Sequence, residues 1–306
     1  MAEAWLDVYA RPQRLVEIGG GRRLNVHDIG KASLTVLFFH GFGGSTLTWR
    51  KVQPAVGEFS RAIAFDIAGA GFSDPGPFPR TASKHVSDVR AALKALGVSP
   101  PYLLVGHSAG SLDVRYFAFR YPEEVAGIVI TDGSSEGQAE SYEAAVPNYA
   151  ARTVAANELY ARNAAIAEAG PSHSEFAALL PSPDPELPDA VNETLRAWYA
   201  RPETWRLLGN EHDCRYGASS DEVLALQRDL GATPICALIA GRRTWNLLSA
   251  EDGAKLLAIW QGMQKEFAQR SVRGIWRIIP DCGHAIPSER PDVVIAAIRE
   301  IADMLR

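Results

Sequence analysis

The segment Gly106-His107-Ser108-Ala109-Gly110 lies between an apolar run, Tyr102 to Val105, and a segment with helical patterning, Leu112 to Tyr121. This order predicts a strand, a sharp turn and a helix. A serine hydroxyl is a weak nucleophile unless it is held in the open beside a base, and a strained strand-to-helix turn places Oγ in that position. An ordinary glycine-rich turn is the alternative, but the strand before and the helix after favour Ser108 as a nucleophile.

The composition is that of an ordinary globular protein, because 47% of the 306 residues are hydrophobic and 22% are charged. A net charge of −5, with scattered Lys and Arg residues, predicts no nucleic-acid partner. Three cysteines without a Cys-x-x-Cys spacing predict neither a disulfide framework nor a metal site. No run approaches the ~18 apolar residues of a membrane span, and the first residues contain no basic leader. We therefore expect a cytoplasmic protein without a membrane partner.

Short apolar runs predict the strands of one sheet. Two of them, Leu15 to Ile18 and Leu24 to Ile29, flank three glycines and predict an antiparallel hairpin. The others are nearly continuous, as is typical of parallel strands that are buried on both faces. These runs are Leu34 to Phe39, Ala62 to Phe65, Val125 to Thr131, Pro234 to Ala240 and Ile275 to Ile279. Helical patterns between them, over Thr81 to Leu96 and Pro291 to Leu305, predict helices that flank a mostly parallel sheet.

A long insertion separates two of the predicted core strands. Residues 134–231 carry helical patterns and a proline-rich stretch, Pro181 to Pro188, but no strand pattern. We interpret residues 134–231 as a helical cap, and residues 1–133 and 232–306 as the core. A cap over a cleft excludes water and shapes the substrate pocket.

Glycine-rich loops follow two of the predicted strands. The glycines of His40-Gly41-Phe42-Gly43-Gly44 let backbone N–H groups point into a cleft, as an oxyanion requires. This loop lacks the lysine of a phosphate-binding loop, and the loop from Asp66 to Ser73 lacks the third glycine of a dinucleotide fingerprint. We expect no cofactor, and we expect His40 and Asp66 to brace their loops.

Together with the Ser108 turn and a late Gly283-His284, these loops resemble the α/β-hydrolase superfamily over nearly the whole chain. The resemblance implies an α/β-hydrolase fold, with a mostly parallel central sheet, flanking helices and an inserted helical cap. It also implies that His284 is the base of a catalytic triad. The backbone N–H groups of Phe42 and Ala109 would then form an oxyanion hole.

The resemblance leaves the triad acid open. Many relatives carry it about three residues after the glycine that ends the late strand, where this chain has Thr244. Asp132 is the best candidate, because it ends the strand that we expect beside the strand leading to the nucleophile. Relatives that resemble this chain around Asp132 also lack the later carboxylate. Glu251 and Asp252 remain alternatives, although both suit the first turn of a helix.

Ser108, Asp132 and His284 predict hydrolysis of a carboxylic ester or a related acyl bond through an acyl-enzyme, without a cofactor or metal. Epoxide and haloalkane hydrolysis by an aspartate nucleophile is disfavoured, because position 108 is serine. Amide and carbon–carbon bond cleavage would use the same triad and remain open. The alternatives are a non-catalytic ligand-binding protein and a cofactor-free oxygenase or haloperoxidase-like enzyme on the same fold.

The substrate pocket is the least specified part of the sequence. Phe42, Trp245 and Ile286 flank the predicted site, so we expect them to contact an apolar, ester-like small molecule. The same residue types, however, are more often part of a protein core than of a pocket.

Overall fold

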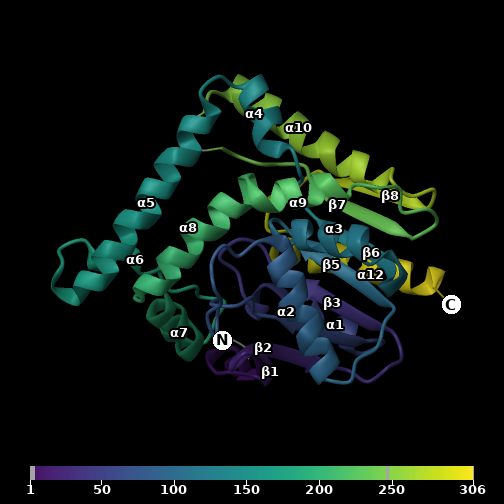
Figure 1. The fold of residues 1–306 in the computed structure, drawn as a ribbon, viewed down its shortest axis with the longest axis horizontal. Helices are drawn as coiled ribbons and strands as arrows, with labels where there is room; N and C mark the ends of the chain where they lie inside the picture. The colour runs from purple at the N-terminus through teal and green to yellow at the C-terminus, as the bar shows by residue number, and fades with distance from the viewer. Residues whose placement is uncertain (1–3, 246–247, 306) are drawn as a thin grey trace.

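The computed structural model describes residues 4–245 and 248–305. Its centre is an eight-stranded sheet with the order β1-β2-β4-β3-β5-β6-β7-β8 (Figure 1). β1 and β2 run antiparallel to their neighbours, and the other strands are parallel. The strands are β1 (Leu15–Gly19), β2 (Arg22–Ile29), β3 (Thr35–Phe39), β4 (Arg61–Phe65), β5 (Tyr102–His107), β6 (Val125–Thr131), β7 (Ile235–Ala240) and β8 (Gly274–Ile279). The predicted fold class, a mostly parallel sheet flanked by helices, is confirmed.

Local sequence explains the hairpin and the central strands. Gly20 and Gly21 have φ angles of 66° and 70°, the left-handed conformation that a tight turn between β1 and β2 requires. Every residue of β3 and of β7 is buried. Because both faces of these strands are covered, the strands read as continuous apolar runs rather than alternating ones.

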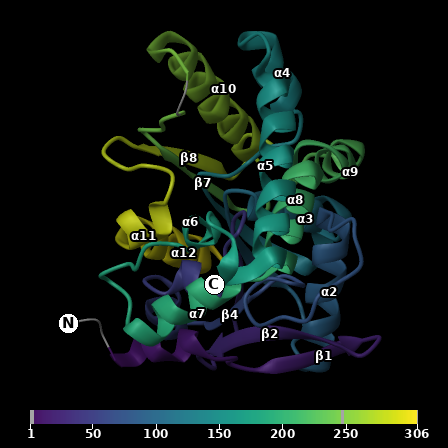
Figure 2. The same ribbon diagram turned by 90° about the vertical axis from the view of Figure 1, so that its left-hand side faces the viewer.

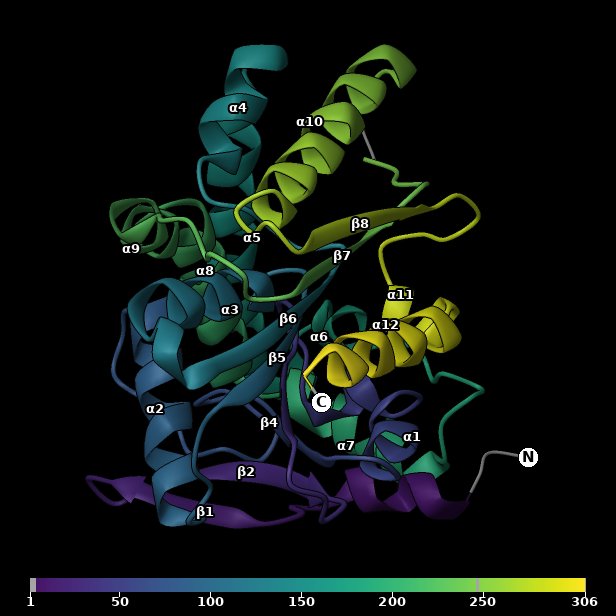
Figure 3. The same ribbon diagram turned by 90° about the vertical axis from the view of Figure 1, so that its right-hand side faces the viewer.

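Helices cover both faces of the sheet (Figure 3). Residues of α1 and α12 pack in the core on one face, together with Trp49 of the short helix η2. Residues of α2, α3, α9 and α10 pack in the core on the other face. The helices outside the connection between β6 and β7 are α1 (Gln53–Gly57), α2 (Ala82–Ala95), α3 (Gly110–Arg120), α10 (Ala250–Ala268), α11 (Ile286–Glu289) and α12 (Pro291–Met304), with the 3-10 helices η1 (Ala4–Ala10), η2 (Thr46–Trp49) and η3 (Pro122–Glu124).

Helices α4 to α9 fill the connection between β6 and β7, and no strand interrupts them in the described chain. They are α4 (Gln138–Ala145), α5 (Tyr149–Ala169), α6 (Phe176–Leu179), α7 (Asp189–Tyr199), α8 (Pro202–Tyr216) and α9 (Ala218–Leu226), with the 3-10 helix η4 (Gly170–Ser172). We call this segment the inserted helices. α5 packs along α8, whereas α4 lies beside α10, and the two project together from the body of the molecule (Figure 2).

The inserted helices do not form one separate layer. α9 packs against α2 and α3, and its Val223 is fully buried in the core on that face of the sheet. The segment therefore returns to the core layer before residue 231, the limit that the sequence predicts for the cap. None of the described helices is both long enough and apolar enough to cross a membrane.

Candidate active site

Ser108 occupies the turn between β5 and α3. Its φ angle is 51°, a strained left-handed conformation for a residue with a side chain. The turn packs so tightly against the neighbouring loop that a Cβ on Gly110 would lie 2.4 Å from the carbonyl oxygen of His40. Only glycine fits at position 110, which explains the second glycine of the segment.

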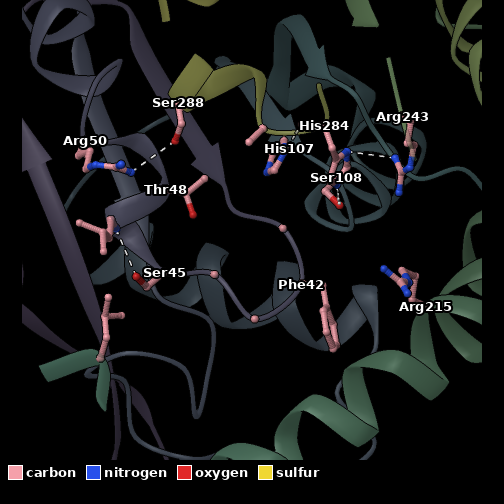
Figure 4. A pocket seen from close by; sticks show the side chains of 16 residues that line it. Phe42, Ser45, Thr48, Arg50, His107, Ser108, Arg215, Arg243, His284 and Ser288 are labelled. Atoms are coloured by element: carbon pink, nitrogen blue, oxygen red, sulfur yellow. Dashed lines mark hydrogen bonds between the residues drawn. The ribbon is translucent and has the colours of Figure 1, made fainter. Parts of the chain in front are cut away.

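His284 reaches Ser108 from the loop between β8 and α11. Its Nε2 lies 2.8 Å from Ser108 Oγ (Figure 4). His107 supports this loop, because its Nε2 lies 3.0 Å from the backbone oxygen of His284. Burial and the neighbouring His284 lower the pKa of His107 to about 4. The His107 ring is therefore neutral near pH 7, and its Nε2 hydrogen is donated to the His284 carbonyl.

Asp132 ends β6 and faces His284 from the other side. Its Oδ2 lies 2.6 Å from His284 Nδ1, and its side chain is fully buried. An ionised carboxylate only accepts hydrogen bonds, so Nδ1 carries a hydrogen that it donates to Asp132, and Nε2 keeps a lone pair toward Ser108. Arg243 Nη1 also lies 3.0 Å from Nδ1, but in this tautomer it cannot donate to that nitrogen and acts only through its charge. This is the tautomer that a general base needs.

Four further donors surround the Asp132 carboxylate. Oδ1 accepts from Ala240 N at 2.9 Å, Trp260 Nε1 at 2.7 Å and Gln264 Nε2 at 3.4 Å. Oδ2 also lies 3.2 Å from Arg243 Nη1. Burial alone would raise the pKa of Asp132, but the hydrogen bond and charge of His284, the charge of Arg243 and the Trp260 hydrogen bond hold it below its usual value. Asp132 is thus kept ionised in a buried site.

The alternative acids lie elsewhere. Thr244 is exposed. Glu251 and Asp252 begin α10, where the Asp252 N–H donates to Ser249 Oγ at 3.0 Å. Both carboxylates form ion pairs with Lys255, at 2.9 and 3.2 Å. Their contacts are those of a helix N-terminus and not those of a triad acid.

The loop after β3 lies against the nucleophile. A Cβ on Gly41 would lie 2.8 Å from Ser108 Cβ. Among the described residues, the N–H groups of Phe42 and Ala109 have no hydrogen-bond acceptor. Gly43 N, in contrast, donates to Glu211 Oε2 of α8 at 3.4 Å. The two N–H groups named for the oxyanion hole are therefore available to a ligand.

His40 and Asp66 make the loop contacts that the sequence predicts for them. His40 Nε2 accepts the N–H of Ile67 at 3.3 Å, and its Nδ1 lies 2.8 Å from Gly41 O. Asp66 accepts the Thr46 N–H at 2.7 Å and also bonds Asn25 Nδ2 and Phe72 N, at 2.7 and 3.1 Å. Among the described residues, neither side chain is hydrogen-bonded to Ser108.

A cavity of about 520 Å³ opens at Ser108 and His284. Phe42 lines it, but the other two expected pocket residues do not. Ile286 is fully buried in the core beneath the sheet, because it opens α11 and points inward. Trp245 packs instead against Tyr142 of α4, with 6.3 Å between the ring centroids. The expectation that Trp245 and Ile286 contact the substrate is not retained.

The sequence did not predict several residues of the site. Trp260 and Gln264 lie one turn apart on α10, so they reach Asp132 together. Arg243 follows β7 and directly precedes Thr244. Arg215 of α8 and Leu195 of α7 line the cavity from the inserted helices. No motif identifies these residues. The one local signal in the sequence is the i, i+4 spacing of Trp260 and Gln264, which places two hydrogen-bond donors on one face of a helix.

The family model of the alpha/beta hydrolase fold matches residues 35–208, more than half of the chain. An uncharacterised protein of Bacillus subtilis is 22% identical, over 98% of this chain and 94% of its own length. A 2-hydroxy-6-oxo-2,4-heptadienoate hydrolase of Pseudomonas putida is 32% identical, over 46% of this chain and 55% of its own length.

Among solved structures, that of an ancestral haloalkane dehalogenase superposes with a TM-score of 0.70. It is 18% identical, and the match covers 95% of this chain and 99% of that one. At this identity the likeness concerns the fold alone. With the family match, it leads to one conclusion: the chain belongs to the α/β-hydrolase fold family and is a hydrolase of that family.

Proposed function

We propose that the protein is a serine hydrolase that cleaves a carboxylic ester, or a related acyl bond, of a small molecule through an acyl-enzyme. One observation carries the proposal: a continuous chain of contacts from Ser108 Oγ to His284 Nε2 at 2.8 Å and from His284 Nδ1 to Asp132 Oδ2 at 2.6 Å. This geometry suits a nucleophile, a base and an acid that holds the base in one tautomer.

In this mechanism, Ser108 Oγ attacks the acyl carbon while its proton passes to His284 Nε2. The N–H groups of Phe42 and Ala109 stabilise the oxyanion that forms. His284 then gives its proton to the leaving alcohol, and the acyl group remains on Ser108. A water molecule, deprotonated by His284, releases the acid and restores the serine.

The binding-protein alternative loses its support, because it rested on the absence of a carboxylate at position 244. Asp132 supplies the carboxylate contact to His284 from another strand. A nucleophilic aspartate, as epoxide or haloalkane hydrolysis by that route requires, is absent at position 108.

A fluorophosphonate probe tests the proposal directly, because it reacts with an activated serine. We expect stoichiometric labelling of the parent protein, and loss of both labelling and ester turnover in Ser108→Ala. Ser288→Ala is the matched control, since Ser288 lines the same cavity but forms no hydrogen bond with a histidine of the described chain. Labelling of Ser108→Ala at the parent rate would refute the serine mechanism.

A further inference from the structure

Three arginine side chains line the cavity at Ser108, and no aspartate or glutamate of the described chain lines it with them. The arginines come from separate segments: Arg50 follows η2, Arg215 lies on α8 and Arg243 follows β7. Figure 4 shows Arg215 and Arg243 on the same side of Ser108, with Arg50 on the opposite side. The cavity therefore presents positive charge close to the nucleophile.

Two of these arginines have their charge compensated by the protein. Arg50 lies 3.5 Å from Glu186 and 3.9 Å from Asp184, and it donates to Ser288 Oγ at 3.4 Å. Arg243 lies 3.2 Å from Asp132. Neither guanidinium requires a ligand for charge balance.

Arg215 differs from both. It forms no ion pair and no hydrogen bond with any described residue, and its Nε is buried without an acceptor. Its guanidinium carbon lies 4.4 Å from the ring centroid of Tyr216 and 5.3 Å from that of Phe42. Figure 4 shows the side chain extending from α8 toward the side on which Phe42 and Ser108 lie. The aromatic rings hold the cation in place but leave its N–H groups unused.

Glu211, one helical turn before Arg215, does not compensate it. Its carboxylate bonds the Gly43 N–H instead, at 3.4 Å. Burial raises the pKa of Glu211 to about 7, although the charges of His85 and Arg215 oppose that rise. A carboxyl group that is partly protonated near pH 7 supplies less than a full negative charge.

A partly buried guanidinium without a counter-charge costs free energy, which an anionic ligand would recover. The planar fork of arginine matches a carboxylate, with two parallel N–H···O bonds. One uncompensated positive charge suits a singly charged carboxylate better than a doubly charged phosphate. We propose that Arg215 binds a carboxylate carried by the substrate, so that the preferred substrates are acyl esters with a free carboxylate at the far end of the acyl chain. This inference rests on the proposed serine hydrolase function.

A matched pair of chromogenic esters tests the inference. The p-nitrophenyl ester of valerate and the mono-p-nitrophenyl ester of glutarate have acyl chains of equal length and differ in the terminal carboxylate. We expect the parent protein to give a higher kcat/KM for the glutarate ester. In Arg215→Gln, the ratio of the two kcat/KM values should fall at least about 10-fold, as is typical for loss of a charge-assisted hydrogen bond. Arg215→Lys should keep part of the preference.

Arg206→Gln is the matched control on the same helix. Arg206 pairs with Glu168 at the surface and does not line the cavity, so its loss should leave the ratio unchanged. If Arg215→Gln does not fold, the salt dependence of the parent protein still tests the proposed carboxylate binding. Its kcat/KM for the glutarate ester should fall as NaCl is raised, while that for the valerate ester should change little.

The possible outcomes separate the two proposals. If Ser108-dependent hydrolysis of the valerate ester is found, but the glutarate ester has no advantage or keeps it in Arg215→Gln, the inference is overturned and the serine mechanism stands. If neither ester is hydrolysed and the fluorophosphonate does not label Ser108, the proposed function fails and the inference fails with it.

Discussion

Asp132 Oδ2 lies 2.6 Å from His284 Nδ1, although 152 positions of sequence separate the two residues. The contact forms because β6 and β7 are adjacent in the sheet and β7 pairs in turn with β8. The carboxyl ends of these parallel strands therefore meet at one edge, where the loops after β6 and β8 face each other.

Asp132→Asn tests the role of this contact. The amide keeps the shape, and its oxygen retains the bonds from Trp260 and Ala240 at the Oδ1 position. Its NH₂ group then faces His284 Nδ1 and donates to it, which places the imidazole hydrogen on Nε2 and removes the base. We expect ester turnover to fall by about 10⁴-fold, as in the best-studied triad. Single-turnover kinetics, with circular dichroism to check folding, would measure the loss.

Glu251→Gln and Asp252→Asn are the controls for this variant. Both residues belong to the first turn of α10, whose N-cap is Ser249, so each change should have only a small effect on stability and leave turnover near the parent value. Parent-like activity in Asp132→Asn, with loss in either control, would move the acid to α10.

Trp260→Phe tests whether the hydrogen bond from Trp260 stabilises the Asp132 carboxylate. The indole N–H donates to Asp132 Oδ1 at 2.7 Å, and the side chain is 2% exposed. Phenylalanine keeps most of the packing but removes a hydrogen bond to a charged group, so we expect a loss of roughly 1.5 to 3 kcal/mol of stability. Because the same bond helps keep Asp132 ionised, kcat/KM should also fall, by about 10-fold. Urea denaturation and ester kinetics measure the two effects.

Trp205→Phe is the control that separates a loss of stability from a loss of kcat/KM. Trp205 also donates its indole N–H, to Tyr199 O at 2.9 Å, but it lies within the inserted helices and does not contact Asp132. We expect Trp205→Phe to lose stability, with less effect on kcat/KM. If both variants lose activity to the same extent, the Trp260 bond does not act through Asp132.

The sequence predicted those parts of the site that follow directly from strands. Ser108, Asp132 and His284 each stand after an apolar run, and parallel strands bring their carboxyl ends to one edge. The structure places these three side chains in contact, while their catalytic roles remain a proposal. Trp260 and Arg243 could not be identified in the same way, because their contacts with Asp132 depend on how α10 and the loop after β7 pack.

The pocket was less predictable than the strand ends. Ile286 is only two residues from His284, but it begins a helix whose first side chain points into the core. Arg215 lies far from any motif and enters the cavity only because α8 packs over the loop that contains Phe42. Such contacts depend on the tertiary arrangement of the inserted helices, which hydrophobic periodicity does not specify.

Phe42→Ala tests whether the inserted helices form part of the acyl pocket. The Phe42 ring packs against Tyr160 of α5 and His212 of α8, at centroid distances of 5.8 and 6.3 Å. Removing the ring deletes an apolar wall but keeps the backbone N–H. We therefore expect kcat/KM for p-nitrophenyl octanoate to fall by about 10-fold, with a smaller change for the acetate. Phe176→Ala, in the same apolar cluster but outside the cavity lining, should keep the parent chain-length profile. An unchanged profile in Phe42→Ala would place the acyl pocket elsewhere.

Glu211→Gln tests whether the buried carboxyl group of Glu211 is protonated in the folded protein. Burial raises the pKa of Glu211 to about 7, whereas an unfolded glutamate titrates near ~4.3. Between these values the folded state holds a proton that the unfolded state has released. The contribution of Glu211 to stability is therefore fully present below about pH 4.3, falls as the pH rises toward 7, and stays constant above that. Glutamine keeps an acceptor for the Gly43 N–H and does not titrate, so the parent protein should lose stability relative to Glu211→Gln between pH 5 and pH 8.

Urea denaturation of both proteins at the two pH values measures this difference, and the comparison cancels the titration of groups common to both. Glu203→Gln is the control, because Glu203 lies on the same helix with its side chain 69% exposed and paired with Arg206 at 3.6 Å. Its stability difference from the parent should be nearly the same at pH 5 and pH 8, since the side chain stays in contact with water in both the folded and the unfolded chain. If Glu211→Gln behaves like Glu203→Gln, Glu211 is ionised throughout this range. It would then offset the charge of Arg215, and the cavity would lose the uncompensated cation on which carboxylate recognition depends.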